Sequence, residues 1–134
     1  MTQEERNLLI QDLCGRLPYG VIAKKEYSFV FTNGTISKSK KIERLDLEDI
    51  DYLISGDNCV DVLKPYLRPM SSMTEEEQKE YHKTFRAEPY GSGIGYEYVE
   101  SARSFDWLDK HHFDYRELIN KGLALNAQEG MYKN

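Results

Sequence analysis

The chain has 134 residues, of which 40% are hydrophobic and 31% charged, and its formal net charge is −5 at pH 7. This composition suits a folded globule and excludes wholesale disorder, and the length suits a single domain over residues 1–134. The acidic balance argues against nucleic acid as a main partner. Because no apolar run could cross a bilayer and the first residues are too acidic for a secretory signal, we expect a cytoplasmic protein without a membrane partner.

A helix is predicted at the start of the chain. Thr2 followed by Glu5 forms a capping-box pattern, and the leucines after it recur at helical spacing. Pro18 should end this helix, because the residue before a proline is pushed out of the helical region. Residues 19–23 then read as a short strand.

A β-hairpin is predicted next. Aromatic residues alternate with polar and β-branched ones from Tyr27 to Thr32, and Asn33-Gly34 follows. Asn-Gly between two extended runs is a strong hairpin signal, because both residues accept a positive φ at low cost. The returning strand should run from Thr35 towards Ile42, and its lysines indicate an exposed edge.

The middle of the chain is harder to interpret. Residues 45–54 fit either a strand, through alternating apolar residues, or a helix ended by Gly56; we favour the strand and leave the helix open. Pro65 and Pro69 predict an extended, irregular connector between them. A second capping box, Thr74 with Glu77, predicts a helix over about 75–85.

The last third of the chain mixes loops and helices. Residues 88–99, rich in glycine and tyrosine, read as an exposed loop or a loose strand pair. Ser104 is the expected cap of one short helix, and Asp114 with Glu117 the start of another that ends near Gly122. From Gln128 onward the chain should fray. Together these elements predict an α+β fold: a small antiparallel sheet around the Asn33-Gly34 hairpin, packed with an N-terminal helix and C-terminal helices.

Three tyrosines in the glycine-rich segment, Tyr90, Tyr96 and Tyr98, are the leading candidates for binding a partner. Tyrosine offers a large, rigid contact surface, and glycine and serine add adaptable hydrogen bonding, a composition common in recognition loops. The alternative is a surface loop whose tyrosines lie back on the core. The sequence therefore predicts a partner-binding loop and leaves that alternative open.

Candidate catalytic residues are few. The adjacent histidines His111 and His112 cannot chelate one ion as an i, i+4 pair would, and the favoured interpretation is a structural one in which they cap a helix end. A pocket that combined them with Arg68 and Tyr115 would suit a small enzyme or a ligand sensor. No motif points to a metal site or a cofactor, and the two cysteines lack a metal-binding or redox spacing.

A local basic excess lies on both sides of the hairpin turn. Between Lys24 and Arg44 six basic residues face two acidic ones. Its possible anion or nucleic-acid contacts are Lys38, Lys40, Lys41 and Arg44. The simpler interpretation is a solvated strand whose lysines prevent edge-to-edge pairing.

Two segments, residues 64–77 (KPYLRPMSSMTEEE) and residues 111–125 (HHFDYRELINKGLAL), resemble a family of small uncharacterised proteins from gut-bacterial genomes, their phages and mobile elements. The resemblance brings no activity or catalytic residue with it. It implies an accessory gene product that meets a host or phage protein. We therefore expect a non-enzymatic interaction module; the alternatives are a small enzyme or ligand sensor and, more weakly, a nucleic-acid contact. The oligomeric state is left open.

Overall fold

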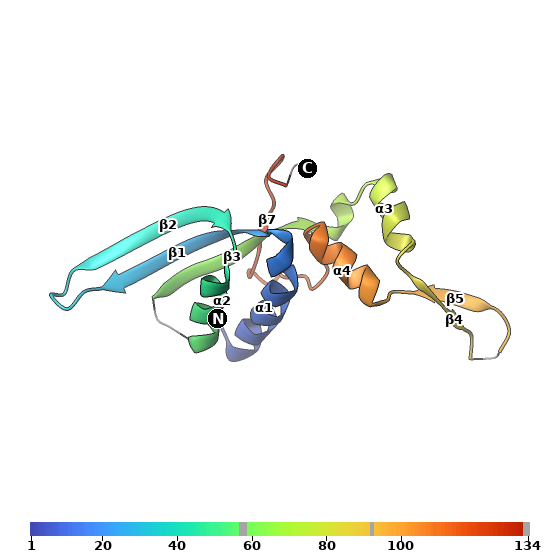
Figure 1. The fold of residues 1–134 in the computed structure, drawn as a ribbon, viewed down its shortest axis with the longest axis horizontal. Helices are drawn as coiled ribbons and strands as arrows, with labels where there is room; N and C mark the ends of the chain where they lie inside the picture. The colour runs from blue at the N-terminus through green and yellow to red at the C-terminus, as the bar shows by residue number, and fades with distance from the viewer. Residues whose placement is uncertain (57–58, 92, 133–134) are drawn as a thin grey trace.

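The computed structural model describes residues 1–56, 59–91 and 93–132 and shows an α+β fold drawn out along one axis, with a β-hairpin at either end (Figure 1). The helices are α1 (Gln3–Arg16), α2 (Leu47–Ser55), α3 (Glu75–His82) and α4 (Ala102–Lys110), with 3-10 turns at Leu17–Tyr19 and Met70–Ser72. The strands are β1 (Ile22–Val30), β2 (Ile36–Arg44), β3 (Val60–Pro69), β4 (Arg86–Pro89), β5 (Tyr96–Val99), β6 (Phe113–Asp114) and β7 (Leu125–Asn126).

The main sheet is mixed rather than purely antiparallel. Its strand order is β2-β1-β3-β6, and β7 also pairs with β3. The β1–β2 hairpin is antiparallel, as predicted, and β3 also pairs with β1 antiparallel, whereas β6 and β7 run parallel to β3. The expected all-antiparallel sheet is therefore wrong at this edge, because two short segments from the end of the chain complete it.

The N-terminal helix and the first hairpin are confirmed. The Thr2–Glu5 capping box is present, and α1 buries Leu9 and Leu13. At the hairpin turn, Asn33 Oδ1 accepts a hydrogen bond from the Thr35 N–H at 2.9 Å, and Gly34 has a φ of 85°. The strand expected at 19–23 begins only at Ile22, because the chain first makes a 3-10 turn, whose start suits the fixed φ of a proline.

Residues 47–55 form helix α2, so the strand favoured from the sequence is wrong. Asp46 and Asp49 make a capping box at its start, and Gly56 ends it with a φ of 69°. Ile50 and Leu53 are buried against the core. Local capping together with burial of this helical face outweighs the short apolar alternation.

The segment with two prolines is strand β3, not an irregular connector. Pro65 lies opposite Ala23 in the last residue pair that β3 makes with β1, and pairing with β7 starts at the next residue, Tyr66. A proline is tolerated where ladder pairing changes, because its missing N–H is least needed there. Pro69 then ends the strand.

Helix α3 confirms the second capping box, although it ends at His82, and β4–β5 confirms the strand-pair interpretation of the tyrosine segment. Helix α4 is capped by Ser101, three residues before the expected Ser104. Ser104 is buried at the third helical position, where its hydroxyl accepts a hydrogen bond from the Ser101 N–H at 2.9 Å.

Within residues 115–132 no helix follows Asp114, contrary to expectation. The Asp114 carboxylate accepts hydrogen bonds from the N–H groups of Leu118 and Ile119, at 2.9 and 3.0 Å, as a cap would. Glu117, however, has a φ of 58°, which interrupts a right-handed helix. Gly122 has the expected positive φ, 75°.

The C-terminal segment is anchored as far as the structure describes it. The hydroxyl of Tyr132 donates a hydrogen bond to the Tyr66 carbonyl at 2.6 Å and accepts one from the Ile22 N–H at 2.9 Å. Fraying from Gln128 is therefore wrong up to Tyr132, because one side chain ties the segment to two strands. Residues 133–134 lie outside the described part of the chain.

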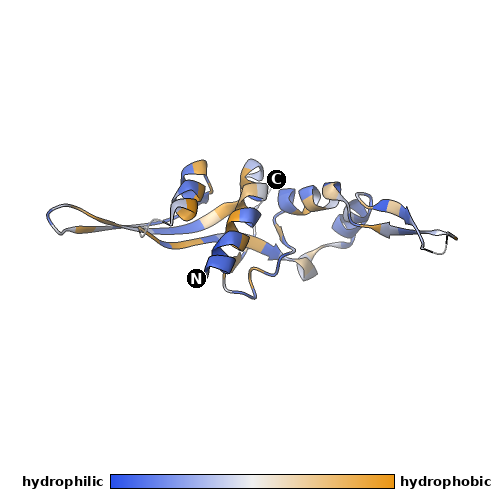
Figure 2. Ribbon diagram, turned by 90° about the horizontal axis from the view of Figure 1, so that it is seen from below, coloured by the Kyte–Doolittle hydropathy of each residue, from blue (hydrophilic) through white to orange (hydrophobic). Residues whose placement is uncertain are grey.

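Two groups of buried apolar side chains follow each other along the molecule. The larger lies between the sheet and helices α1 and α2, with Leu9, Leu13, Ile50 and Leu67 among its members. Seen from below, α1 crosses in front of the strands (Figure 2). The smaller group centres on Tyr81, Leu108 and Phe113 and joins α3, α4 and β6.

Candidate functional site

The β4–β5 hairpin carries two exposed tyrosines on one of its faces. Tyr96 pairs with Pro89 and Tyr98 with Ala87, so these four side chains share a face. The tyrosines are 68% and 73% exposed. The hairpin thus holds both aromatic rings out in solvent on regular, hydrogen-bonded backbone.

The third predicted tyrosine supports the turn of this hairpin. The Tyr90 N–H donates to the Gly95 carbonyl at 3.2 Å, and a Cβ placed on Gly95 would lie 3.2 Å from the Tyr90 ring. Gly95 also has a φ of 79°. Tyr90 therefore packs over the turn, while Ile94 beside it is 80% exposed.

A hollow of about 460 Å³ lies at the base of the hairpin. It is lined by Tyr98, His82 and Phe85. The Tyr81 ring meets Phe85 edge-on at 5.0 Å and stacks on Trp107 at 5.5 Å between centroids. The smaller buried group therefore fixes the wall of the hollow, and Tyr98 completes it from the hairpin.

The opposite face of the hairpin is acidic. Glu88 and Glu97 lie directly across from each other. Like charges in that position repel each other, and while Glu88 has an ion pair with Arg86 at 2.5 Å, the described part of the chain gives Glu97 none. Local sequence spacing could have placed Glu97 opposite the tyrosine face, because Tyr96-Glu97-Tyr98 has the period of a strand.

Arg68 is held by Glu77 rather than left free. Its guanidinium makes two hydrogen bonds to the Glu77 carboxylate, both 2.8 Å long, and lies 4.1 Å from the centre of the Phe113 ring. The paired arginine lowers the pKa of Glu77 to about 2. Arg68 thus joins β3 to α3.

The two histidines point to different neighbours. His111 packs on Trp107 with ring centroids 4.2 Å apart, whereas His112 stacks on Tyr132 at 3.7 Å. His112 has a φ of 65°, and burial, aided by the positive charges of Arg16 and its other neighbours, lowers its pKa to about 4. It is therefore neutral at pH 7.

Tyr115 belongs to a buried polar network on another side. Its hydroxyl donates to Asp109 at 2.8 Å, and burial followed by this carboxylate raises the pKa of Tyr115 to about 12. Asp12 accepts from Arg16 at 2.8 Å and from Arg116 at 2.7 Å, and Arg16 also donates to the Phe113 carbonyl. This network links α1 to α4 and to the segment that follows α4.

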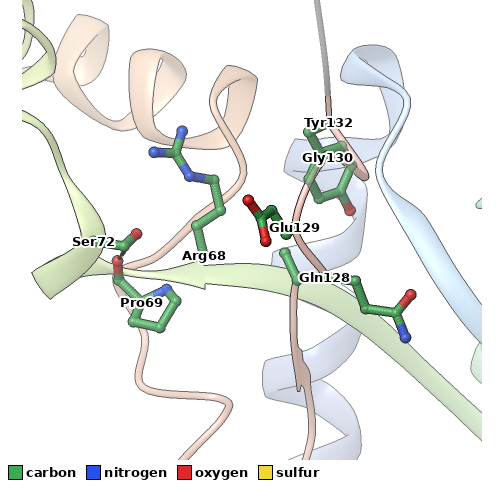
Figure 3. A pocket seen from close by; sticks show the side chains of 8 residues that line it. Arg68, Pro69, Ser72, Gln128, Glu129, Gly130 and Tyr132 are labelled. Carbon is green, nitrogen blue, oxygen red and sulfur yellow. Dashed lines mark hydrogen bonds between the residues drawn. The ribbon is translucent and has the colours of Figure 1, made fainter.

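The cavity beside Arg68 does not gather the four predicted residues. It has a volume of about 370 Å³, and Arg68 and Ser72 face Gln128, Glu129 and Tyr132 of the C-terminal segment across it (Figure 3). The lining does not include His111, His112 or Tyr115. Arg68 and the histidines are close in the backbone, since the Arg68 N–H donates to the His112 carbonyl, but their side chains diverge.

The basic residues of the first hairpin are divided between two environments. Lys25 is only 2% exposed and contacts Asp49 at 2.6 Å, so it is not available to a ligand. Lys38, Lys40, Lys41 and Arg44 are on the edge strand β2, where Lys40 contacts Glu26 at 3.5 Å. Lys64 of β3, opposite Lys24, adds to the face of Lys38 and Lys40, a neighbour that only the strand register reveals.

Among residues 1–56, 59–91 and 93–132, no three histidine, cysteine or acidic side chains are grouped so that they could hold a metal ion. None of the described helices is long and apolar enough to span a membrane. Comparison with family models, with curated proteins and with solved structures gives no match for the chain.

Proposed function

We propose that the protein is a non-enzymatic binding module that docks onto another protein through the Tyr96–Tyr98 face of the β4–β5 hairpin. One observation carries the proposal: two neighbouring tyrosines are held outward on regular backbone beside an aromatic hollow. Exposed aromatic groups of this kind are enriched in protein interfaces. Their ordered strands also reduce the entropy lost on binding.

The charges around the hairpin indicate the partner's chemistry. Residues 75–100 contain seven acidic and three basic side chains, and the unpaired Glu97 lies opposite Glu88. A partner surface whose apolar side chains cover the tyrosines and whose lysines or arginines lie around them would be complementary to this acidic segment. The resemblance of the chain to phage and mobile-element proteins points to a host or phage protein as the source of such a surface.

The test replaces Tyr96 and Tyr98 together with alanine. Tagged protein is used to capture partners from host lysate with and without phage infection, and binding of the purified partner is then measured by calorimetry. Loss of an aromatic anchor costs about 2 kcal/mol or more, so affinity should fall at least about 30-fold. Tyr19→Ala, which removes a 37% exposed tyrosine far from the hairpin, is the matched control.

The outcomes separate the hairpin from other surfaces. Partner binding that survives in the double variant, while far-UV circular dichroism shows an intact fold, would refute the proposal. Equal losses in the Tyr19→Ala control would also refute it, because the effect would then not belong to the hairpin.

The cavity of Figure 3 supports a second candidate, a small-ligand sensor or small enzyme at Arg68. Its supporting observation is the enclosure of a cationic side chain between β3 and the C-terminal segment. The Glu77 carboxylate already occupies that guanidinium, so a ligand would have to compete with a bidentate ion pair. A bound metabolite detected by native mass spectrometry, and lost in Arg68→Met, would favour this candidate over the binding module.

Nucleic-acid contact through Lys38 to Arg44 is the weakest candidate. The structure adds Lys24 and Lys64 to the same face as Lys38 and Lys40, but Glu26 lies within 4 Å of both Lys24 and Lys40. Counterion release predicts retention of an oligonucleotide that falls steeply with salt. Absence of retention at low salt would eliminate the contact.

A further inference from the structure

The β1–β2 hairpin projects beyond the rest of its sheet at the end of the molecule opposite β4–β5 (Figure 1). Strand β3 follows β1 only as far as Tyr27 in the register. Beyond that point the ribbon exposes the facing pair Val30 and Ile36, which are 71% and 58% exposed, together with Phe29 and Phe31. The molecule therefore exposes apolar side chains at both ends of its long axis, where the two hairpins lie.

The two ends have opposite charge. Residues 25–41, which form the outer part of the ribbon from the Lys25–Lys41 pair onward, include four lysines and one acidic residue, Glu26. Residues 75–100, around the second hairpin, have seven acidic and three basic residues, an excess of four negative charges. Charge of opposite sign at the two ends favours contact between one end and the other end of a neighbouring copy.

Both ends also present strand edges. Strand β2 is the last in the order of the main sheet, and β4 and β5 pair only with each other in the described part of the chain. Unpaired N–H and C=O groups on such edges can accept another strand. The backbone of each hairpin can therefore extend the sheet of another molecule.

The faces of the two hairpins match when their sheets are joined. On β2, Lys38 and Lys40 lie on the same face, and Phe29 of the neighbouring strand lies on the other. On the second hairpin, Glu88 and Glu97 share one face, and the tyrosines occupy the other. A sheet continued from β2 into this hairpin can bring lysines beside glutamates on one side and aromatic rings together on the other.

We infer that the β4–β5 hairpin binds the β2 edge of a second copy of this chain, so that molecules associate head to tail. This inference rests on the proposed function, because it takes the hairpin as a protein-docking surface and names its occupant. When two copies associate in this way, the pair still has one unoccupied β4–β5 hairpin and one unoccupied β2 edge, so further copies can add to form rings or filaments. The hairpin strands have only four residues each, so each contact is weak and depends on concentration.

The symmetric alternatives are opposed by charge. Two β2 edges would bring Lys38, Lys40 and Lys41 of one copy against the same lysines of the other. Two β4–β5 hairpins would confront Glu88 and Glu97 with their own copies. Like charges placed side by side disfavour both arrangements, whereas the head-to-tail contact pairs opposite charges.

The test is sedimentation velocity of the full chain over micromolar to millimolar concentration, at low salt and at about 1 M NaCl, where the Debye length is only about 3 Å. Two charge reversals are compared with wild type: Lys38→Glu/Lys40→Glu on the ribbon and Glu88→Lys/Glu97→Lys on the hairpin. Their thermal unfolding is checked first. Lys38→Glu and Glu97→Lys alone serve as milder versions if a double variant does not fold.

Wild type should associate at low salt and dissociate at high salt. Each reversal alone should weaken association by about tenfold or more, because like charges then meet at every contact. An equimolar mixture of the two variants should associate again, since every contact between unlike variants pairs opposite charges.

Several results would overturn the inference. A wild-type protein that stays monomeric at every concentration and salt level does not form this contact. If wild type associates but neither salt nor either charge reversal changes that association, the molecules associate through another surface. Self-association of the hairpin variant alone would show a ribbon–ribbon contact, and that of the ribbon variant alone a hairpin–hairpin contact. A monomeric wild type that still captures a foreign partner through Tyr96 and Tyr98 would remove this inference and leave the proposed function standing.

Discussion

Replacing Lys25 with methionine should destabilise the protein more than any neutralisation of a surface lysine. The Lys25 ammonium contacts Asp49 at 2.6 Å and donates to the Arg44 carbonyl at 2.6 Å. Burial lowers the pKa of Lys25, but the hydrogen bond and charge of Asp49 outweigh burial, so its pKa lies above the ordinary value and the side chain stays charged. Methionine keeps the length of the side chain and removes the charge.

The magnitude follows from what the substitution leaves behind. Asp49 is 5% exposed, and after the substitution its carboxylate keeps only neutral donors, the Tyr27 hydroxyl at 2.5 Å and the Asp46 N–H at 3.0 Å. Removing one partner of a buried ion pair costs about 3–5 kcal/mol, a large share of the total stability of a small domain. Urea unfolding followed by circular dichroism measures the change in the free energy of unfolding.

Two further variants make the result specific. Lys24→Met removes the neighbouring lysine, 44% exposed and 3.7 Å from Glu26, and should change stability by less than about 0.5 kcal/mol. Lys25→Met combined with Asp49→Asn should be more stable than Lys25→Met alone, because no uncompensated charge remains buried. A loss below about 1 kcal/mol for Lys25→Met, or strictly additive effects in the double variant, would refute the reasoning.

Three other perturbations test contacts at the centre of the molecule. The pKa of His112 is near 6.5 in the unfolded chain and about 4 in the folded one, so the free energy of unfolding should fall by about 2 kcal/mol as the pH drops from 6.5 to 4. His112→Asn, whose side chain tolerates the positive φ, should lack this loss when urea unfolding is measured across that pH range. Because the pKa of Glu77 is lowered to about 2, its ionised carboxylate stabilises the fold above about pH 4.5, and the free energy of unfolding should fall by about 1–2 kcal/mol as the pH drops from 4.5 towards 2. Glu77→Gln should show a smaller change in the free energy of unfolding over this pH range. Tyr132→Phe removes the hydroxyl that forms hydrogen bonds with β1 and β3, and it should lower the free energy of unfolding, measured by thermal denaturation, by about 1–2 kcal/mol. An unchanged free energy of unfolding would show that this hydroxyl does not anchor the C-terminal segment.

Elements with a local signal could be predicted from the sequence alone. The capping boxes at Thr2 and Thr74 and the Asn33-Gly34 turn act within a few residues, so their geometry depends on neighbours in the chain. The glycines and tyrosines of residues 88–99 predict the strand pair around Tyr96 and Tyr98 as one of two alternatives. These local signals place the tyrosines of the candidate interface in the chain, but they do not show the hollow beside Tyr98 or the pairing of Glu88 with Glu97.

Tertiary structure decided the elements whose local signals compete. Residues 47–55 carry both a strand alternation and a helix cap, and the burial of Ile50 and Leu53 selects the helix. β3 includes Pro65 because its pairing changes from β1 to β7 at that residue. Both outcomes depend on packing or pairing partners that lie far along the chain.

The chemistry of individual side chains depended on the same long-range contacts. Composition and charge determined a folded, acidic chain with a basic hairpin and a tyrosine-rich segment. Only the folded structure showed that Lys25 is buried against Asp49 while its neighbours are exposed, that Arg68 is held by Glu77, and that the two histidines diverge. The reason is physical: burial and pairing depend on which distant segments pack together, and these set the charge state and accessibility of a side chain.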